Sequence, residues 1–170
     1  MLRGTLLGNK VLVEKGYEDI YWKGWYGEVV NHRLELDLIE GIFLAEREKL
    51  KIESSGRILS LPELFDTACS LDEKFPVKFL VYKDLRNRGL PVRMGVEGVD
   101  FFVYERGTKP GRKKPVSWIV FAYSENDYCD LDELERTVKL GKGVRAKVVW
   151  AIVDGDNDIT YYIVDVKKDL

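Results

Sequence analysis

The stretch VYKDLRNRGLPVRMGVEGVDFFVYERG, residues 81–107, decides the fold of the second half of the chain. Its first part places apolar residues along one face of a helix and charged residues along the other. Gly89 stands where a helix takes a left-handed C-terminal cap, and Pro91 prevents the helix from continuing. Two runs rich in β-branched and aromatic residues follow, at 92–94 and 99–104, with glycines between them. The stretch therefore predicts a helix followed by a β-hairpin.

The residues before this stretch predict a small N-terminal α/β domain. Residues 2–14 alternate as a short hairpin does, and the aromatic-rich run 17–27 predicts a short helix. The clearest amphipathic helical pattern of this half covers residues 34–50, with a short strand after it. Ser60 is the expected N-cap of a further helix, with Glu63 at the capping-box position.

The residues after the stretch predict a second α/β unit with a central sheet. Residues 117–123 lack alternation, which indicates a strand buried on both faces. A helix with an acidic N-terminus is expected at 130–140, between this strand and two further strands at 144–153 and 159–166. The charged, proline-bounded seam at 71–76 gives two domains, residues 1–72 and 73–170, in an α+β protein.

The charge balance argues against a strongly basic nucleic-acid-binding surface. The chain has 27 Lys and Arg against 29 Asp and Glu, a net charge of −2. An RNA-binding surface must therefore be a local patch or come from a partner. The basic loop 105–115 is such a patch; it is either a solvated loop or a phosphate-contacting loop in which Arg112 and Lys113 would take part.

The inventory of reactive side chains predicts no cofactor and no metal. There are two widely spaced cysteines, Cys69 and Cys129, and one histidine, His32, which leaves little for a zinc site or for imidazole catalysis. The run 154–158, DGDND, resembles the start of a calcium loop but lacks the glutamate that completes one, so an acidic hairpin turn is expected. With no signal-peptide or membrane-spanning pattern, a cytoplasmic protein is the expectation.

Taken in order, several segments resemble the archaeal tRNA-splicing (tRNA-intron) endonuclease family, and the resemblance covers nearly the whole chain. Its small domain is similar to GTLLGNKVLV, GWYGE and LELDLIEGIFLAEREKLKI, and its nuclease domain is similar to YKDLRNRGLPVRMG, VDFFVYERG and VRAKVVWAIVDGDNDITYYIV. The resemblance implies a C-terminal, restriction-endonuclease-like nuclease domain with a central mixed sheet. It also implies metal-free cleavage of precursor tRNA at bulge-helix-bulge junctions, which leaves a cyclic phosphate and a 5′-hydroxyl.

In that family a Tyr, a His and a Lys carry the chemistry: one accepts the 2′ proton, one protonates the leaving oxygen and a cation offsets phosphorane charge. The resemblance places the tyrosine on Tyr104. It places the histidine on Pro115 and the lysine on Ala146. Lys147 is one residue further along, which on a strand means the opposite face.

The resemblance therefore implies a non-catalytic, structural subunit of a heteromeric enzyme, expected as α2β2 with a catalytic subunit and precursor tRNA as partners. It also implies that an acidic loop, formed by Asp154, Asp156 and Asp158, docks on a basic pocket of another subunit. The last strand would pair across the main subunit interface and bury Tyr161 or Tyr162. Lys139 falls where the family has an arginine near the RNA bulge, and the further candidates for RNA contact are Arg145 and, in the basic loop, Arg112 and Lys113. Two alternatives remain: an active endonuclease using Tyr104 and Lys147, or an RNA- or protein-binding module of the same fold.

Overall fold

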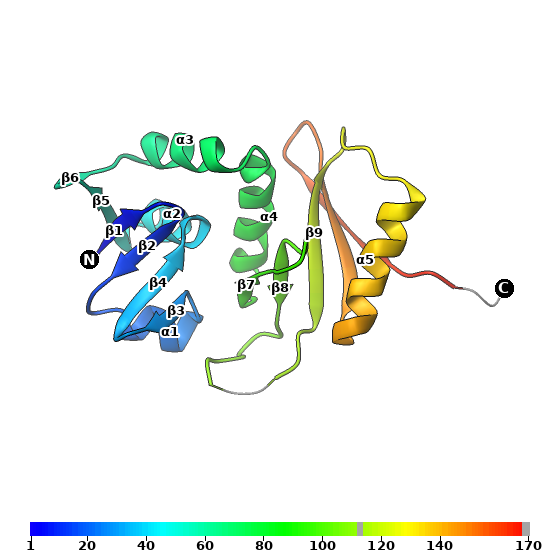
Figure 1. The fold of residues 1–170 in the computed structure, drawn as a ribbon, viewed down its shortest axis with the longest axis horizontal. Helices are drawn as coiled ribbons and strands as arrows, with labels where there is room; N and C mark the ends of the chain where they lie inside the picture. The colour runs from blue at the N-terminus through cyan, green and yellow to red at the C-terminus, as the bar shows by residue number, and fades with distance from the viewer. Residues whose placement is uncertain (112–113, 168–170) are drawn as a thin grey trace. The chain divides into compact units, whose positions relative to one another are not determined.

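The computed structural model describes residues 1–111 and 114–167 and contains two compact units (Figure 1). The first comprises Met1–Pro76 and Lys109–Gly111; the second comprises Val77–Thr108 and Arg112–Leu170, of which 112, 113 and 168–170 are not described. Each unit has its own sheet, and each is taken separately below.

The first unit is built on a mixed six-stranded sheet in the order β3-β4-β2-β1-β5-β6. Only β1 and β5 run parallel, and the remaining neighbours are antiparallel. The expected hairpin over 2–14 is confirmed as the β1–β2 pair. The strands are β1 (Leu2–Leu7), β2 (Lys10–Val13), β3 (Glu28–Val30), β4 (Arg33–Asp37), β5 (Leu50–Ser54) and β6 (Arg57–Ile58).

Three helices accompany this sheet: α1 (Glu18–Gly24), α2 (Leu38–Glu46) and α3 (Leu61–Leu71). The predicted capping of α3 is confirmed, because the Ser60 side chain accepts from the Glu63 amide and the Glu63 carboxylate accepts from the Ser60 amide. The helix predicted over residues 34–50 is too long at both ends, because α2 begins at Leu38 and ends at Glu46. Leu34 and Leu36 are fully buried while the residues after each are partly exposed, a two-residue period that forms strand β4.

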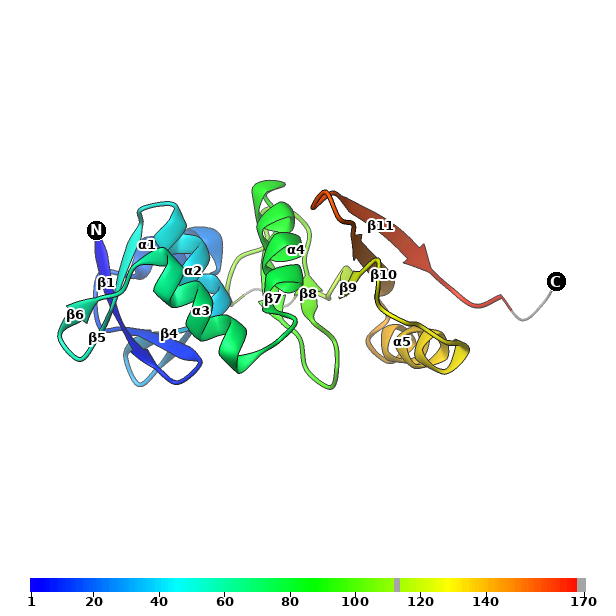
Figure 2. The same cartoon turned by 90° about the horizontal axis from the view of Figure 1, so that it is seen from above.

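The second unit is built on a mixed five-stranded sheet in the order β11-β10-β9-β8-β7, which confirms the predicted central mixed sheet (Figure 2). Strands β9 and β10 are parallel, joined through α5 (Leu131–Val144), and the other neighbours are antiparallel. The strands are β7 (Val92–Met94), β8 (Phe101–Val103), β9 (Trp118–Ser124), β10 (Lys147–Val153) and β11 (Ile159–Val164).

The helix, glycine stop and hairpin predicted from residues 81–107 are all present. Helix α4 (Phe75–Asn87) ends before Gly89, whose φ of 80° is the left-handed conformation expected of a cap. Strands β7 and β8 then pair antiparallel, with Val92 opposite Val103.

Helices α4 and α5 pack on opposite faces of this sheet, as the alternation along β9 shows. Ile119 lies beside α5 at Gly141, whereas Val120 shares a pocket with Leu85 of α4. Residues 119–123 are all buried, so the prediction of a strand buried on both faces is confirmed. The alternation also assigns a face to each residue at the strand ends, where the candidate site lies.

Candidate functional site

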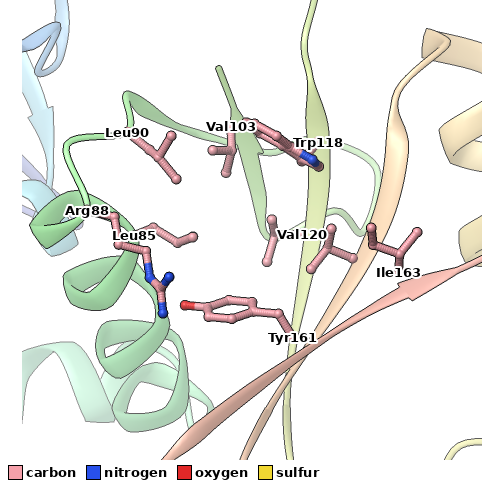
Figure 3. Close-up of a pocket in the computed structure, with 9 residues that line it drawn as sticks. Leu85, Arg88, Leu90, Val103, Trp118, Val120, Tyr161 and Ile163 are labelled. Atoms are coloured by element: carbon pink, nitrogen blue, oxygen red, sulfur yellow. The ribbon is translucent and has the colours of Figure 1, made fainter. Parts of the chain in front are cut away.

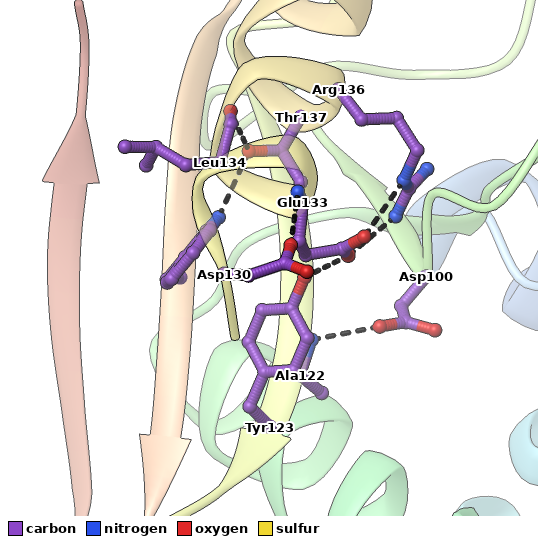
Figure 4. Close-up of polar contacts among 9 residues, drawn as sticks. Asp100, Ala122, Tyr123, Asp130, Glu133, Leu134, Arg136 and Thr137 are labelled. Carbon is purple, nitrogen blue, oxygen red and sulfur yellow. Dashed lines mark hydrogen bonds and ion pairs between the residues drawn. The ribbon is translucent and has the colours of Figure 1, made fainter. Parts of the chain in front are cut away.

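A polar network fixes α5 and the strands around the site (Figure 4). The Tyr123 hydroxyl donates to Glu133 at 2.8 Å, and the Arg136 guanidinium donates to the same carboxylate at 2.7 and 3.0 Å. Asp100 lies directly before β8, which begins at Phe101. Its side-chain carboxylate, in place of a backbone carbonyl of a paired strand, accepts a hydrogen bond from the Ala122 amide at 2.7 Å. Burial, followed by the bond to Glu133, raises the pKa of Tyr123. This network could not be predicted, because it joins residues of β9 and α5 to Asp100, which lies far from both in the sequence.

Tyr104 follows β8 directly and is held by its backbone, which donates to the Pro91 carbonyl at 3.0 Å. Its side chain is half-buried. Burial raises the pKa of its hydroxyl, and the positive charge of Arg93 offsets only part of that effect. A phenol whose pKa is raised loses its proton less readily, so this environment works against a role for Tyr104 as a base.

Ala146 and Lys147 lie at the same end of the sheet but present their side chains differently. Ala146 packs against the core on the α5 face, and its amide donates to the Gly141 carbonyl at 3.0 Å. Lys147 opens β10, pairs with Trp118 and is exposed. Pro115, in the irregular segment before β9, is exposed. The pyrrolidine of Pro115 and the methyl group of Ala146 carry no titratable or charged group.

The acidic turn between β10 and β11 uses its three carboxylates in different ways. Asp154 accepts from the amides of Asp156 and Asp158 at 2.9 and 3.0 Å, so its side chain shapes the turn. Glu125, from the loop after β9, accepts from the Gly155 amide at 3.0 Å and braces the turn from outside. The side chains of Asp156 and Asp158 are exposed, which leaves them as the two carboxylates available to a partner.

The two tyrosines of β11 point to opposite faces of the sheet. The Tyr161 hydroxyl donates to Asp84 of α4 at 2.6 Å, whereas Tyr162 is 54% exposed. Burial, followed by the bond to Asp84, raises the pKa of Tyr161. Tyr161 is thus engaged within its own unit, and Tyr162 is the tyrosine of this strand available for an intermolecular contact.

The basic residues singled out from the sequence are exposed where the structure describes them. Lys139 lies on α5, and Arg145 caps the end of α5 in a left-handed conformation with φ of 57°. Arg112 and Lys113 lie outside the described residues.

Three general properties of the described residues bear on the kind of site present. Within 1–111 and 114–167, no group of three or more His, Cys, Asp or Glu side chains is placed to hold a metal ion. In the same part of the chain, every helix is too short or too polar to cross a bilayer. Both cysteines carry free thiols.

Two domain families match the chain. Residues 2–65 match the domain described as tRNA intron endonuclease, N-terminal domain, and residues 75–161 match the one described as tRNA intron endonuclease, catalytic C-terminal domain. Together they cover most of the sequence, in the order in which the two units follow one another.

Several archaeal proteins named tRNA-splicing endonuclease are similar over most of the chain. A protein from Methanococcoides burtonii is 40% identical over 98% of this chain, which spans only 46% of that relative. A protein from Thermococcus onnurineus is 39% identical over 89% of the chain and 87% of its own length, and one from Methanothermobacter thermautotrophicus is 38% identical over 94% of each. The chain therefore belongs to the tRNA intron endonuclease family.

Proposed function

We propose that this chain is a structural subunit of a tRNA-splicing endonuclease, which supports cleavage of precursor tRNA at bulge-helix-bulge junctions by a catalytic partner subunit. The proposal is carried by the resemblance of the sequence to the family, which places the family's histidine on Pro115 and its lysine on Ala146. Without an imidazole and an ammonium there, the leaving oxygen has no acid and the phosphorane no cation.

The surroundings of Tyr104 support the same conclusion. A tyrosine that accepts the 2′ proton must first lose its own, and burial raises the pKa of Tyr104. Lys147 does not replace the missing ammonium, because Ala146 packs toward the α5 face and the next residue of a strand points to the other face.

The acidic turn supports a role in assembly. Asp156 and Asp158 stand exposed on a turn whose shape Asp154 and Glu125 already fix, so a basic pocket on a partner meets a preformed surface. We propose docking of this turn on the partner and pairing of β11 across the main interface, in an α2β2 assembly.

Co-expression with a catalytic tRNA-splicing endonuclease subunit from the same organism tests the proposal. Cleavage of a bulge-helix-bulge RNA is expected from the mixture, and each chain alone should be inactive. Replacing both Asp156 and Asp158 by Asn should weaken the complex, whereas the control substitution of exposed Asp132 on α5 by Asn should not. Cleavage by this chain alone contradicts the proposal.

Two further variants separate the structural subunit from an active enzyme. If the chain is active through Tyr104 and Lys147, then Tyr104→Phe or Lys147→Ala abolishes cleavage. If it is structural, both variants support the partner as well as the unchanged chain does.

A further inference from the structure

The first part of the basic loop between β8 and β9, residues 105–111, is folded back on itself and partly buried. Thr108 is only 2% exposed and Pro110 is buried, whereas a solvated loop leaves its side chains in water. The Thr108 amide and hydroxyl both donate to the Glu105 carbonyl, at 3.2 and 2.7 Å, and close a tight turn. This part of the loop therefore has a defined conformation, which its glycine, proline and basic residues did not predict.

One cation of this loop caps the C-terminal end of α4. Arg106 donates from Nε to the Arg88 carbonyl at 2.7 Å. The Arg88 side chain is engaged elsewhere, because its guanidinium is bonded to Asp84 at 2.9 Å and lies beside the Tyr161 ring (Figure 3). A cation at a helix C-terminus satisfies an open carbonyl and offsets the negative end of the helix dipole. Arg106 thus stabilises the end of a helix in the second unit.

A second cation of the same loop caps α1, in the first unit. Lys109–Gly111 belong to that unit, and the Lys109 ammonium donates to the Lys23 carbonyl, in the last turn of α1, at 2.6 Å. Helix α1 has only seven residues, none of them buried, and helices this short are not stable on their own. It also ends at Trp25 with φ of 53°, a left-handed conformation that only glycine adopts without cost. The end of α1 therefore gains from an external cap.

These contacts bind the positive charges of the loop within the molecule. A loop that tracks phosphates uses its cations on the nucleic acid, whereas cations that cap helix ends keep the loop in one place. We infer that residues 105–111 form a strap, in which Arg106 and Lys109 hold the loop to a helix end in each unit and order the chain that follows Tyr104. The first unit thereby contributes to the order of a loop that begins and ends in the second. This inference does not rest on the proposed function.

Hydrogen exchange of single amides in the full-length chain, without RNA or a partner, tests the inference. Lys109→Met keeps the aliphatic stem and removes the ammonium. Exchange should then become about 5- to 10-fold faster at the Trp25 amide, at the end of α1, and at the Thr108 amide, in the strap. Lys109→Arg keeps a charged donor and should protect both amides nearly as well as lysine does. The matched control is Lys51→Met, at an exposed lysine of β5, which should leave both amides unchanged.

Faster exchange at Trp25 alone overturns the inference, because the strap then does not depend on the cap. Equal exchange in the Lys109→Met and Lys51→Met variants also overturns it, since Lys109 then orders neither segment. The same holds if Lys109→Arg exchanges as fast as Lys109→Met, because the positive charge would then play no part. The measurement needs neither cleavage nor a catalytic subunit, so its outcome is independent of the co-expression test.

Discussion

Replacing Gly141 by alanine should destabilise the second unit, although alanine is the better helix former. Gly141 lies within α5, where a Cβ would meet the Val148 Cγ2 at 2.4 Å and the Ala146 carbonyl oxygen at 3.1 Å. Val148 is buried and β-branched, so its methyl group cannot rotate away cheaply, and the oxygen belongs to the backbone. The helix must therefore move away from β10.

The magnitude follows from two opposing effects. Alanine gains about 1 kcal/mol over glycine in a helix interior, whereas overpacking a filled core costs about 1–3 kcal/mol. The contact at 2.4 Å is severe, so we expect a net loss of about 1–2 kcal/mol for Gly141→Ala. At Gly143, two residues on, an added Cβ would have no atom of the described residues within 4 Å. Gly143→Ala should therefore stabilise the unit by up to about 1 kcal/mol.

Hydrogen exchange of the β10 amides, followed at increasing urea concentrations, is the suitable assay. The chain contains two compact units, which need not unfold together. A single unfolding transition measured on the whole chain would combine the unfolding free energies of both units. The expected result is faster exchange in Gly141→Ala and slower exchange in Gly143→Ala. Stabilisation by both substitutions would refute the reasoning, since it would mean that α5 and β10 are not closely packed at Gly141.

Three further predictions concern stability. The pKa values of Tyr123 and Tyr161 are raised in the folded state, so above pH about 10 the unfolded chain releases protons that the folded chain keeps, and the unfolding free energy should fall as pH rises. For the buried Tyr123 the slope is at most about 1.4 kcal/mol per pH unit, and Tyr123→Phe should flatten the alkaline side of a pH–urea series. Thr137→Val should cost about 1–3 kcal/mol, measured by hydrogen exchange of the β10 amides in urea, because it removes the acceptor of the Trp150 indole N–H at 3.2 Å; unchanged exchange would exclude that bond. Ser60→Ala should cost about 1 kcal/mol, measured by exchange of the α3 amides, and Ser60→Gly only a few tenths.

Local signals predicted those parts of the fold that depend on neighbouring residues. Gly89 adopts the left-handed cap, and Ser60 begins α3, because each choice is decided within one turn. The helix predicted for residues 34–37 is wrong, because leucines at 34 and 36 fit a strand as well as one face of a helix. Pairing with β2, which the local sequence does not reveal, makes this segment a strand. Strand β3 was missed for a related reason: it is an exposed edge strand of three residues. The boundary at residues 72 and 73 stays a prediction.

In the candidate site, too, local features could be predicted from the sequence and contacts between distant residues could not. The order of segments predicts the catalytic positions at Tyr104 and Ala146, and these assignments stay predictions. Contacts between distant residues could not be predicted, because no local pattern pairs Tyr161 with Asp84, 77 residues earlier.

Strand β11 also bears on how the isolated chain behaves in solution. From Ile159 to Val164 the edge of the sheet is uninterrupted by proline or by any charged residue, and Tyr162 and Ile163 are largely exposed. Proteins normally protect such edges, because an open strand recruits other strands and seeds aggregates. Free copies of this chain should therefore be prone to associate through this edge and to precipitate when overproduced.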